Sequence, residues 1–402
     1  MNPRQNALRP YHALAGLCAA LSLLTACSSN DKADPPASLV KIRGTVRVEQ
    51  LWSANVGGAA PKLRLGLGIA VDGGRVFAAG HDGDVRAYAL NSGKSLWRAK
   101  TRVKVSGGPG AGDGLVVVGA SYGDIVALDA FTGALRWKTR VNSEILSAPA
   151  IGGGVVLLRA VDGRLVALSA ENGRQLWAAE QNVPRLSLRG AATPVIAGDM
   201  AISGFDNGRV MAIGLRDGQT AWDIAVAPPS GRSELERLVD IDSGLSVVGD
   251  DVYAVTYQGK VARLAKDSGQ VWWSRDLSSH RGLATDEDGV YISTSEGQLI
   301  KIGRRTGVEL WRTDSLKNRK ISAPAVFGGQ VAVADYKGFV HFFDANTGAP
   351  TARESTVGLR GNSWLGGGPR VSNPPVVVGD VALFINDKGH VTAFRVTGPR
   401  RR

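Results

Sequence analysis

The sequence predicts an all-β fold, an eight-bladed β-propeller whose blades are four-stranded antiparallel sheets. Three observations predict it: a repeat of about forty residues, a glycine-containing hairpin turn in each of eight repeats, and an N-terminal segment that supplies what the last repeat lacks. The chain has 52 glycines among 402 residues without a collagen period, which indicates many tight turns. Its 44% hydrophobic content allows a large core.

The repeat is clearest in residues 80–97, 120–137 and 161–177, each of which runs from a glycine turn to a tryptophan. Weaker copies extend to the end of the chain, and two intervals are longer than the others. The eight turn glycines are Gly83, Gly123, Gly163, Gly208, Gly259, Gly297, Gly338 and Gly389. This count predicts eight blades.

Each repeat can be divided into four strands. The first is expected to contain Ser-Ala-Pro, as at 147–149 and 322–324, and the second is β-branched, as at 115–118. A tight hairpin follows, in which glycine takes the positive φ. A third, alternating strand (125–128) leads through a Thr-Gly or Ser-Gly turn to a fourth strand with the tryptophan. Four strands per forty residues is typical of propeller blades, whereas a β-solenoid has shorter coils.

The repeated tryptophans are expected to wedge between adjacent blades, each with its indole N–H bonded to a neighbouring turn. Those in one register are Trp97, Trp137, Trp177, Trp222, Trp272 and Trp311. The last repeat stops after 391–394 without such a strand, and Glu49–Trp52 supplies the missing piece. Residues 45–55 are therefore expected to complete the last blade, which would close the ring and remove open sheet edges.

The N-terminus has the pattern of an export signal. Arg4 and Arg9 precede an apolar run at 13–24 that is too short to span a bilayer. The run ends in Leu-Thr-Ala-Cys27, which resembles the lipobox of bacterial lipoproteins; an ordinary signal peptide with a chance cysteine is the alternative. The predicted organisation is a signal peptide at 1–26, acylated Cys27 with a flexible tether at 27–44, the propeller at 45–398 and a basic tail at 399–402. Serines rather than Asp after Cys27 predict lipid anchoring at the periplasmic face of the outer membrane.

Charge and motifs narrow the function classes. The formal net charge of +12 would allow binding to nucleic acid, anionic lipid or acidic proteins. The export signal argues against nucleic acid. No metal-ligand spacing, P-loop or Gly-x-Ser-x-Gly motif occurs, so we expect no metal, no cofactor and no catalysis. The acidic stretch 285–289 is interpreted as a surface turn rather than a calcium loop. The mature chain would retain only Cys27, hence no disulfide.

The segment 127–137 (Ala-Leu-Asp-Ala-Phe-Thr-Gly-Ala-Leu-Arg-Trp) resembles the tryptophan-docking repeat of quinoprotein propellers. Two exported bacterial families share that repeat: the pyrroloquinoline-quinone alcohol dehydrogenases and the BamB family of outer-membrane assembly lipoproteins. The lipobox, the length and the eight repeats together resemble BamB proteins over essentially the whole chain. The enzyme alternative is disfavoured because the chain is shorter and lacks the vicinal cysteine pair that stacks on the quinone.

The resemblance to BamB implies a non-catalytic scaffold of the outer-membrane β-barrel assembly (BAM) complex. It would bind the periplasmic POTRA domains of BamA, assist insertion of β-barrel proteins and have unfolded outer-membrane proteins as a further class of partner. A peptidoglycan- or carbohydrate-binding propeller is a third alternative, because Asn362 and Trp364 in the glycine-rich segment 361–368 could offer a stacking surface.

Two interruptions of the repeat, 183–190 and 234–242, resemble the neighbouring loops through which BamB proteins contact BamA. By that resemblance the partner-binding residues are Leu186, Leu188, Arg189, Asp240 and Asp242. The alternation of Leu186 and Leu188 with Ser187 would place both leucines on one side of an extended segment. Alternatively, 186–190 is a strand that enters a blade with both leucines in the core, and the two aspartates form a solvated loop edge.

Overall fold

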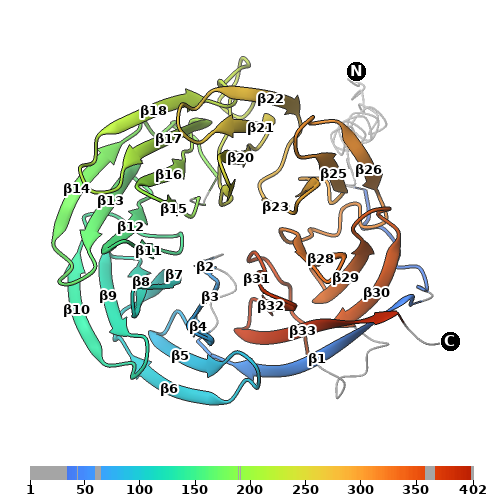
Figure 1. The fold of residues 1–402 in the computed structure, drawn as a ribbon, viewed down its shortest axis with the longest axis horizontal. Coiled ribbons are helices and arrows are strands. Elements are labelled where there is room, and N and C mark those ends of the chain that lie inside the picture. Colours follow the sequence, from blue (N-terminus) through green and yellow to red (C-terminus); the bar gives the residue numbers. More distant parts are fainter. Residues whose placement is uncertain are drawn as a thin grey trace, which may run out of the picture. The chain divides into compact units, whose positions relative to one another are not determined.

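The computed structural model describes residues 34–42, 44–58, 65–188, 190, 192–357 and 367–399. From Ala37 onward these residues form a ring of eight sheets around a central axis (Figure 1). The sequence order of the blades follows the ring, and within blades 1 to 7 the chain runs from the axis to the rim. The predicted eight-bladed β-propeller is therefore confirmed. In the described part of the chain, we found no helix long and apolar enough to cross a membrane.

Blade 1 contains, from axis to rim, β3 (Ile69–Asp72), β4 (Arg75–Ala79), β5 (Asp84–Ala89) and β6 (Ser95–Lys100). Blade 2 contains β7 (Val105–Gly112), β8 (Leu115–Ala120), β9 (Asp124–Asp129) and β10 (Leu135–Arg140). Blade 3 contains β11 (Ala150–Gly152), β12 (Val155–Arg159), β13 (Arg164–Ser169) and β14 (Gln175–Glu180). A two-residue strand, β2 (Gly66–Leu67), pairs in parallel with β7 near the axis. The other pairings within these blades are antiparallel.

Blade 4 contains β15 (Val195–Ala197), β16 (Met200–Gly204), β17 (Arg209–Gly214) and β18 (Thr220–Ala225). Blade 5 contains β19 (Ser246–Val248), β20 (Asp251–Val255), β21 (Lys260–Ala265) and β22 (Val271–Asp276). Blade 6 contains β23 (Leu283–Thr285), β24 (Gly289–Ser293), β25 (Leu299–Gly303) and β26 (Glu309–Thr313). Blade 7 contains β27 (Ala325–Phe327), β28 (Gln330–Ala334), β29 (Phe339–Asp344) and β30 (Pro350–Ser355).

Blade 8 closes the ring with strands from both ends of the chain. Its strands are β31 (Val376–Val378), β32 (Val381–Ile385), β33 (His390–Pro399) and, outermost, β1 (Val46–Asn55). The antiparallel register places Trp52 opposite Ala393 and Asn55 opposite His390. The closing strand predicted from Glu49–Trp52 is thus confirmed.

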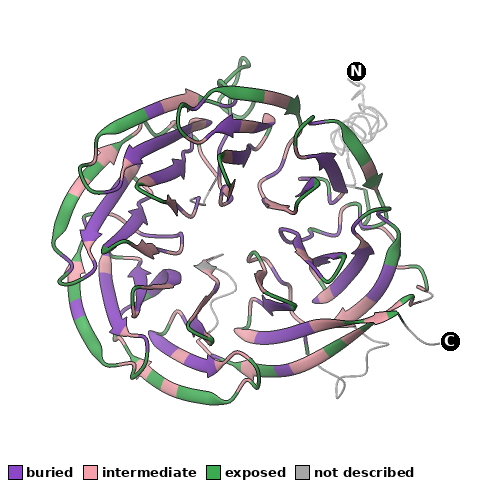
Figure 2. Ribbon diagram, viewed as in Figure 1, coloured by how far each residue is buried: buried purple, intermediate pink, exposed green. Residues whose placement is uncertain are grey.

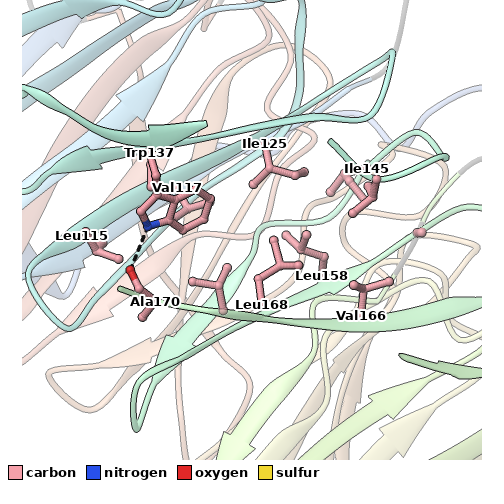
Figure 3. Packing of buried hydrophobic residues seen from close by; sticks show 13 residues of the cluster. Leu115, Val117, Ile125, Trp137, Ile145, Leu158, Val166, Leu168 and Ala170 are labelled. Carbon is pink, nitrogen blue, oxygen red and sulfur yellow. Dashed lines mark hydrogen bonds between the residues drawn. The ribbon is translucent and has the colours of Figure 1, made fainter. Parts of the chain in front are cut away.

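The core lies between neighbouring blades. The second strand of a blade, β-branched and apolar, is buried on both faces, whereas the rim strands are largely exposed (Figure 2). Between blades 2 and 3, for example, Val117 and Ile125 of one sheet pack against Leu158 and Val166 of the next (Figure 3). Similar clusters lie between the other blades and hold the ring together, and the residues that the structure describes contain no cysteine.

Each docking tryptophan joins its blade to the following one. The indole N–H donates to a backbone carbonyl in the next blade at 2.7–3.1 Å. The indole also lies on the glycine of that blade's last turn, where a Cβ atom would be only 2.6–2.8 Å from it. The tryptophans are Trp52, Trp97, Trp137, Trp177, Trp222, Trp273 and Trp311. The predicted wedge between blades is confirmed.

One member of the predicted series is wrong. In blade 5 the docking residue is Trp273, which donates to the Arg304 carbonyl at 3.1 Å and contacts Gly307. Trp272 points outward and is 52% exposed. The sequence does distinguish the two neighbouring indoles: in blades 1 to 4 and 6 the docking tryptophan follows the turn glycine of its own blade by four residues, and Trp273 follows Gly269 by the same spacing.

Blade 7 carries Ala352 where other blades carry the tryptophan, and ring closure explains why. A docking tryptophan needs the turn between the third and fourth strands of the next blade. Blade 8 has no such turn, because its fourth strand, β1, comes from the other end of the chain. The space is filled from the neighbouring strand instead: Ala352 lies opposite Phe342, which packs edge-on against Phe327 and Phe394.

Two local predictions were also wrong. The Ser-Ala-Pro segments precede the innermost strands instead of belonging to them, because β11 begins at Ala150 and β27 at Ala325. In the blade 5 hairpin the positive φ falls on Gln258 (φ 48) and not on Gly259. The acidic stretch at 285–289 forms the expected turn, in which Asp286 accepts backbone hydrogen bonds from Asp288 and Gly289.

Candidate partner-binding loops

The two interruptions of the repeat are links between blades on one face of the ring. Residues 181–194 join β14 to β15, and residues 226–245 join β18 to β19. This face also carries the hairpins between the second and third strands. Gly163 contacts Gln181 and Val183, and Gly208 contacts Ala227 and Val239. We call it the link face.

The first loop exposes an apolar side chain on a fixed base. Leu186 is 42% exposed and Leu188 is half-buried. At the base, the Gln181 side chain donates to Asp223 at 2.7 Å and accepts from Asn207 at 3.1 Å. Arg189 lies outside the described residues.

The second loop is partly exposed and partly core. Its outer turn is a capping box in which Glu236 accepts from the Ser233 backbone N–H and the Ser233 hydroxyl accepts from the Glu236 N–H. Leu235 on this turn is 61% exposed. Further along, Val239 and Ile241 are buried, and the Ile241 N–H donates to the Phe205 carbonyl at 3.2 Å. The loop is therefore anchored in blade 4.

Asp240 connects the two loops. Its side chain is fully buried, and Oδ2 accepts a hydrogen bond from the backbone N–H of Leu188. Its own carbonyl accepts from the Tyr257 N–H at 2.9 Å, which ties the same residue to blade 5. The next aspartate, Asp242, packs against Gly190, where an added Cβ atom would be 2.7 Å from Oδ1. The conformation of the first loop thus depends on the second.

Beneath the loops lies a buried charged group that the sequence analysis did not find. Arg159, 1% exposed, forms an ion pair with Asp206 at 3.1 Å and stacks over Phe205 with its guanidinium 4.5 Å from the ring centre. Burial raises the pKa of Asp206, and Arg159 opposes that rise. The only sequence signal was an arginine ending the apolar strand Val-Val-Leu-Leu-Arg159.

The loop aspartates titrate far from the usual carboxylate range. Burial, with a smaller contribution from Asp206, raises the pKa of Asp240 to about 7 although the Leu188 N–H opposes the rise. Burial and the charges of Asp240 and Asp206 raise the pKa of Asp242 to about 8. Oδ1 of each is buried without a hydrogen-bond partner among the described residues. At neutral pH Asp242 is therefore mostly protonated, and Asp240 is close to its midpoint.

Comparison with known proteins identifies the family. Residues 81–313 match the family model described as outer membrane protein assembly factor BamB. The BamB of Pseudomonas aeruginosa is 44% identical over 383 residues, which cover 95% of this chain and 98% of that protein. The chain belongs to the BamB family.

Further BamB proteins support the assignment. That of Alkalilimnicola ehrlichii is 43% identical, covering 96% of this chain and 97% of the relative. The crystal structure of BamB from Moraxella catarrhalis superposes with a TM-score of 0.77 at 28% identity, covering 87% of this chain and 100% of that one. A quinohemoprotein alcohol dehydrogenase from Comamonas testosteroni, at 14% identity and a TM-score of 0.67, shares the fold alone.

Membership of the BamB family makes this chain a non-catalytic propeller rather than a dehydrogenase. Within the described residues no cluster of three or more His, Cys, Asp or Glu side chains could hold a metal ion. Cys27, and Asn362 and Trp364 of the alternative carbohydrate surface, lie outside the described residues.

In this BamB-family propeller the predicted site residues fall into two groups. Leu186 and Leu188 lie on a surface loop, so the alternative of a core strand at 186–190 is wrong. Asp240 is buried, so the alternative of a solvated loop edge is wrong for that residue. Asp242 is half-buried beside Gly190. The leucines are available to a partner, whereas Asp240 can act only by positioning Leu188.

Proposed function

We propose that this protein is a lipid-anchored scaffold of the BAM complex at the periplasmic face of the outer membrane, where it binds the POTRA domains of BamA. The observation that carries the proposal is the pair of linked loops, which present Leu186 to solvent on a backbone held by Asp240. A loop that is already ordered loses little conformational entropy on binding. The related proteins named as assembly factors supply the biological context.

The loop surface has the composition of a small protein-binding site. Val183, Leu186 and Leu235 are 40%, 42% and 61% exposed on the link face. Arg185 is exposed beside Leu186, and the sequence places Arg189 close by. Apolar side chains next to arginine are typical of interface hot spots. In this proposal Leu186, Leu188 and Arg189 contact the partner, while Asp240 and Asp242 hold the loop.

The lipid anchor is the second part of the proposal. Cleavage before Cys27 and acylation of its thiol would leave the propeller on the periplasmic side, tethered by the segment that precedes Ala37. Three acyl chains on one cysteine give stable attachment, whereas one chain gives marginal attachment. Mass spectrometry of the mature N-terminal peptide tests this part directly: an unmodified Cys27 would exclude it.

Co-purification tests the loop site. The variant Leu186→Glu places a charge in the proposed contact without touching the core, so we expect BamA to be lost from the purified protein. The matched control is Leu135→Glu on β10, because Leu135 is an equally apolar and 63% exposed residue on the rim of blade 2. Full recovery of BamA with a folded Leu186→Glu variant would overturn the proposed site.

The rim strands support a second part of the proposal, in which the protein also binds unfolded outer-membrane proteins. The outermost strands β6, β10, β14, β22 and β26 each have one unpaired edge. They carry exposed apolar side chains, among them Leu96 (44%), Leu135 (63%) and Leu310 (55%). An extended chain could add to such an edge through main-chain hydrogen bonds, which need no particular sequence.

This second proposal predicts that a denatured outer-membrane protein diluted into buffer aggregates more slowly with the wild-type propeller. Leu135→Glu and Leu310→Glu together should reduce that protection, while Leu186→Glu should not. An aggregation rate that the wild-type propeller leaves unchanged would exclude direct binding of substrates. The two experiments therefore separate the loops from the rim.

A further inference from the structure

A short segment near the N-terminus lies against the ring before the first strand begins. The Ala37 N–H donates to the carbonyl of Lys317 at 2.9 Å, and the Ala37 carbonyl accepts from Arg319 Nη1 at 3.0 Å. Three residues later, the Val40 carbonyl accepts from Arg353 Nη2 at 3.1 Å. We call residues 37–40 the strap.

The side chains of the strap alternate as in an extended strand. Ala37 and Leu39 face the ring, and Leu39 packs on the apolar cluster that contains Leu316 and Ile321. Ser38 and Val40 face solvent, with Val40 64% exposed. The strap therefore uses both main-chain hydrogen bonds and one apolar anchor.

The two arginines that hold the strap are themselves fixed in place. Arg319 is 4% exposed, and its Nε donates to Asp335 Oδ2 at 2.8 Å. The same Asp335 oxygen lies 3.0 Å from His341 Nε2, and Arg353 Nε donates to His341 Nδ1 at 3.3 Å. The chain of contacts Arg319–Asp335–His341–Arg353, in which only Arg353 is half-buried and the others are buried, thus fixes both guanidinium groups that donate to the strap.

We propose that this seat on blades 6 and 7 is a built docking site for the chain's own tether, and that it turns the link face of the ring toward the lipid surface. The orientation rests on the acylation of Cys27 in the proposed function; the docking of the strap does not. The surface toward which this face is turned is a phospholipid bilayer.

The length of chain between Cys27 and the strap limits how far the seat can lie from the lipid anchor. Lys317 belongs to the link between β26 and β27, so the strap begins on the link face, the face that also bears the two candidate loops. Nine residues lie between Cys27 and Ala37, so the chain takes ten steps from one to the other, and each step of a fully extended chain spans at most about 3.3–3.6 Å. The seat can therefore be no more than about 35 Å from the anchor. Without the seat, the tether would extend to Val46 and leave the ring free to turn.

Hydrogen exchange tests the seat without reference to lipid. In the acylated protein in detergent, the Ala37 amide should exchange slowly, and Leu39→Asp should abolish that protection while the strands of blades 6 and 7 stay protected. The matched control is Val40→Asp, which adds the same charge one residue away on the solvent side and should keep the protection. An Ala37 amide that exchanges as fast in the wild type as in Leu39→Asp would overturn the docking site.

Fluorescence transfer tests the orientation. With Cys27 acylated, a single added cysteine can be labelled selectively. Lys337→Cys marks the link face of blade 7, and Asn346→Cys marks its opposite face, since these residues lie in the two different hairpins of one blade. On vesicles of phosphatidylethanolamine and phosphatidylglycerol with acceptor headgroups, transfer should be stronger from position 337. Leu39→Asp should remove this difference, and Val40→Asp should keep it.

The outcomes separate the two proposals. Equal transfer from positions 337 and 346 in a vesicle-bound wild type would overturn the orientation. A protein that does not bind vesicles because Cys27 carries no lipid would overturn both the anchor in the proposed function and the orientation built on it. Slow exchange of the Ala37 amide in that case would still support the docking site.

Discussion

Gly173 lies directly against the indole of Trp137, so that a Cβ atom at Gly173 would be 2.6 Å from Cε3 of the ring. The same indole donates to the carbonyl of Ala170 at 2.8 Å (Figure 3). Blade 2 is thus fastened to the last turn of blade 3 by one hydrogen bond and one close packing contact. A residue larger than glycine at position 173 would disrupt both the hydrogen bond and the packing contact.

Gly173→Ala should lower the free energy of unfolding more than Gly154→Ala. Both glycines have positive φ, +73 and +80, so both variants incur a similar backbone cost. Only Gly173 has a neighbour within 4 Å, so the difference isolates overpacking, which costs about 1–3 kcal/mol. Urea denaturation of the two variants measures it; equal losses would contradict the docking role of the turn.

The two neighbouring tryptophans of blade 5 should behave differently. Trp273→Ala removes the inter-blade hydrogen bond and a large packed ring, and should cost about 3–5 kcal/mol. Trp272→Ala removes a half-exposed ring that lies 6.0 Å from the Arg263 guanidinium, and should cost less than about 1 kcal/mol. Thermal or urea unfolding of each single variant decides which indole docks.

Ala352→Trp should destabilise the ring although it restores the repeat consensus. Phe342 already fills the space opposite Ala352, and blade 8 offers no turn to receive an indole. Overpacking of this kind costs about 1–3 kcal/mol. In the double variant with Phe342→Ala, the two losses should be less than additive, because the smaller residue makes room for the larger one. A single variant as stable as wild type would refute this explanation.

The paired aspartates should make the protein less stable as pH rises from acid to mildly alkaline. The unfolded chain releases these protons near pH 3.9, whereas the folded pKa values are about 7 for Asp240 and about 8 for Asp242. Between these limits the folded state binds more protons. Their contribution is complete below about pH 4 and is lost as pH rises through about 7 to 8.

The double variant Asp240→Asn with Asp242→Asn should flatten that dependence. An amide oxygen can still accept from the Leu188 N–H, so loop geometry is kept. We expect the double variant to gain about 1–3 kcal/mol over wild type at pH 8 and little at pH 4. Urea denaturation at the two pH values measures it, with Asp267→Asn, at an exposed turn, as the control. A gain of the same size at both pH values would contradict the assigned titration.

Much of the fold could be predicted because the repeat itself encodes it. The eight turn glycines, about forty residues apart with two longer intervals, predicted the blade count, and Glu49–Trp52 matched the strand missing after Phe394. Trp272 was the wrong choice although the spacing favours Trp273, which follows the turn glycine Gly269 by four residues as Trp137 follows Gly133. The loops were located as breaks in the period, and the exposure of Leu186 agrees with a surface role.

Contacts between residues far apart in the chain could not be predicted from the sequence. The bond between Asp240 and the Leu188 N–H spans two links, and the Arg159–Asp206 pair joins two blades. No local pattern marks such partners, because each polar group is placed by the packing of different sheets. The strap was likewise interpreted as free tether, since Ala-Ser-Leu-Val carries no turn or periodic signal of its own.

The shared eighth blade also governs when the molecule can mature. Its outer strand, β1, is synthesised first, and its partner β33 is the last strand to be synthesised. Until synthesis reaches the end of β33, β1 lacks this partner and Trp52 has only one side of its pocket. Completion of the ring therefore requires the chain through β33, and a product truncated before β33 would remain an open arc.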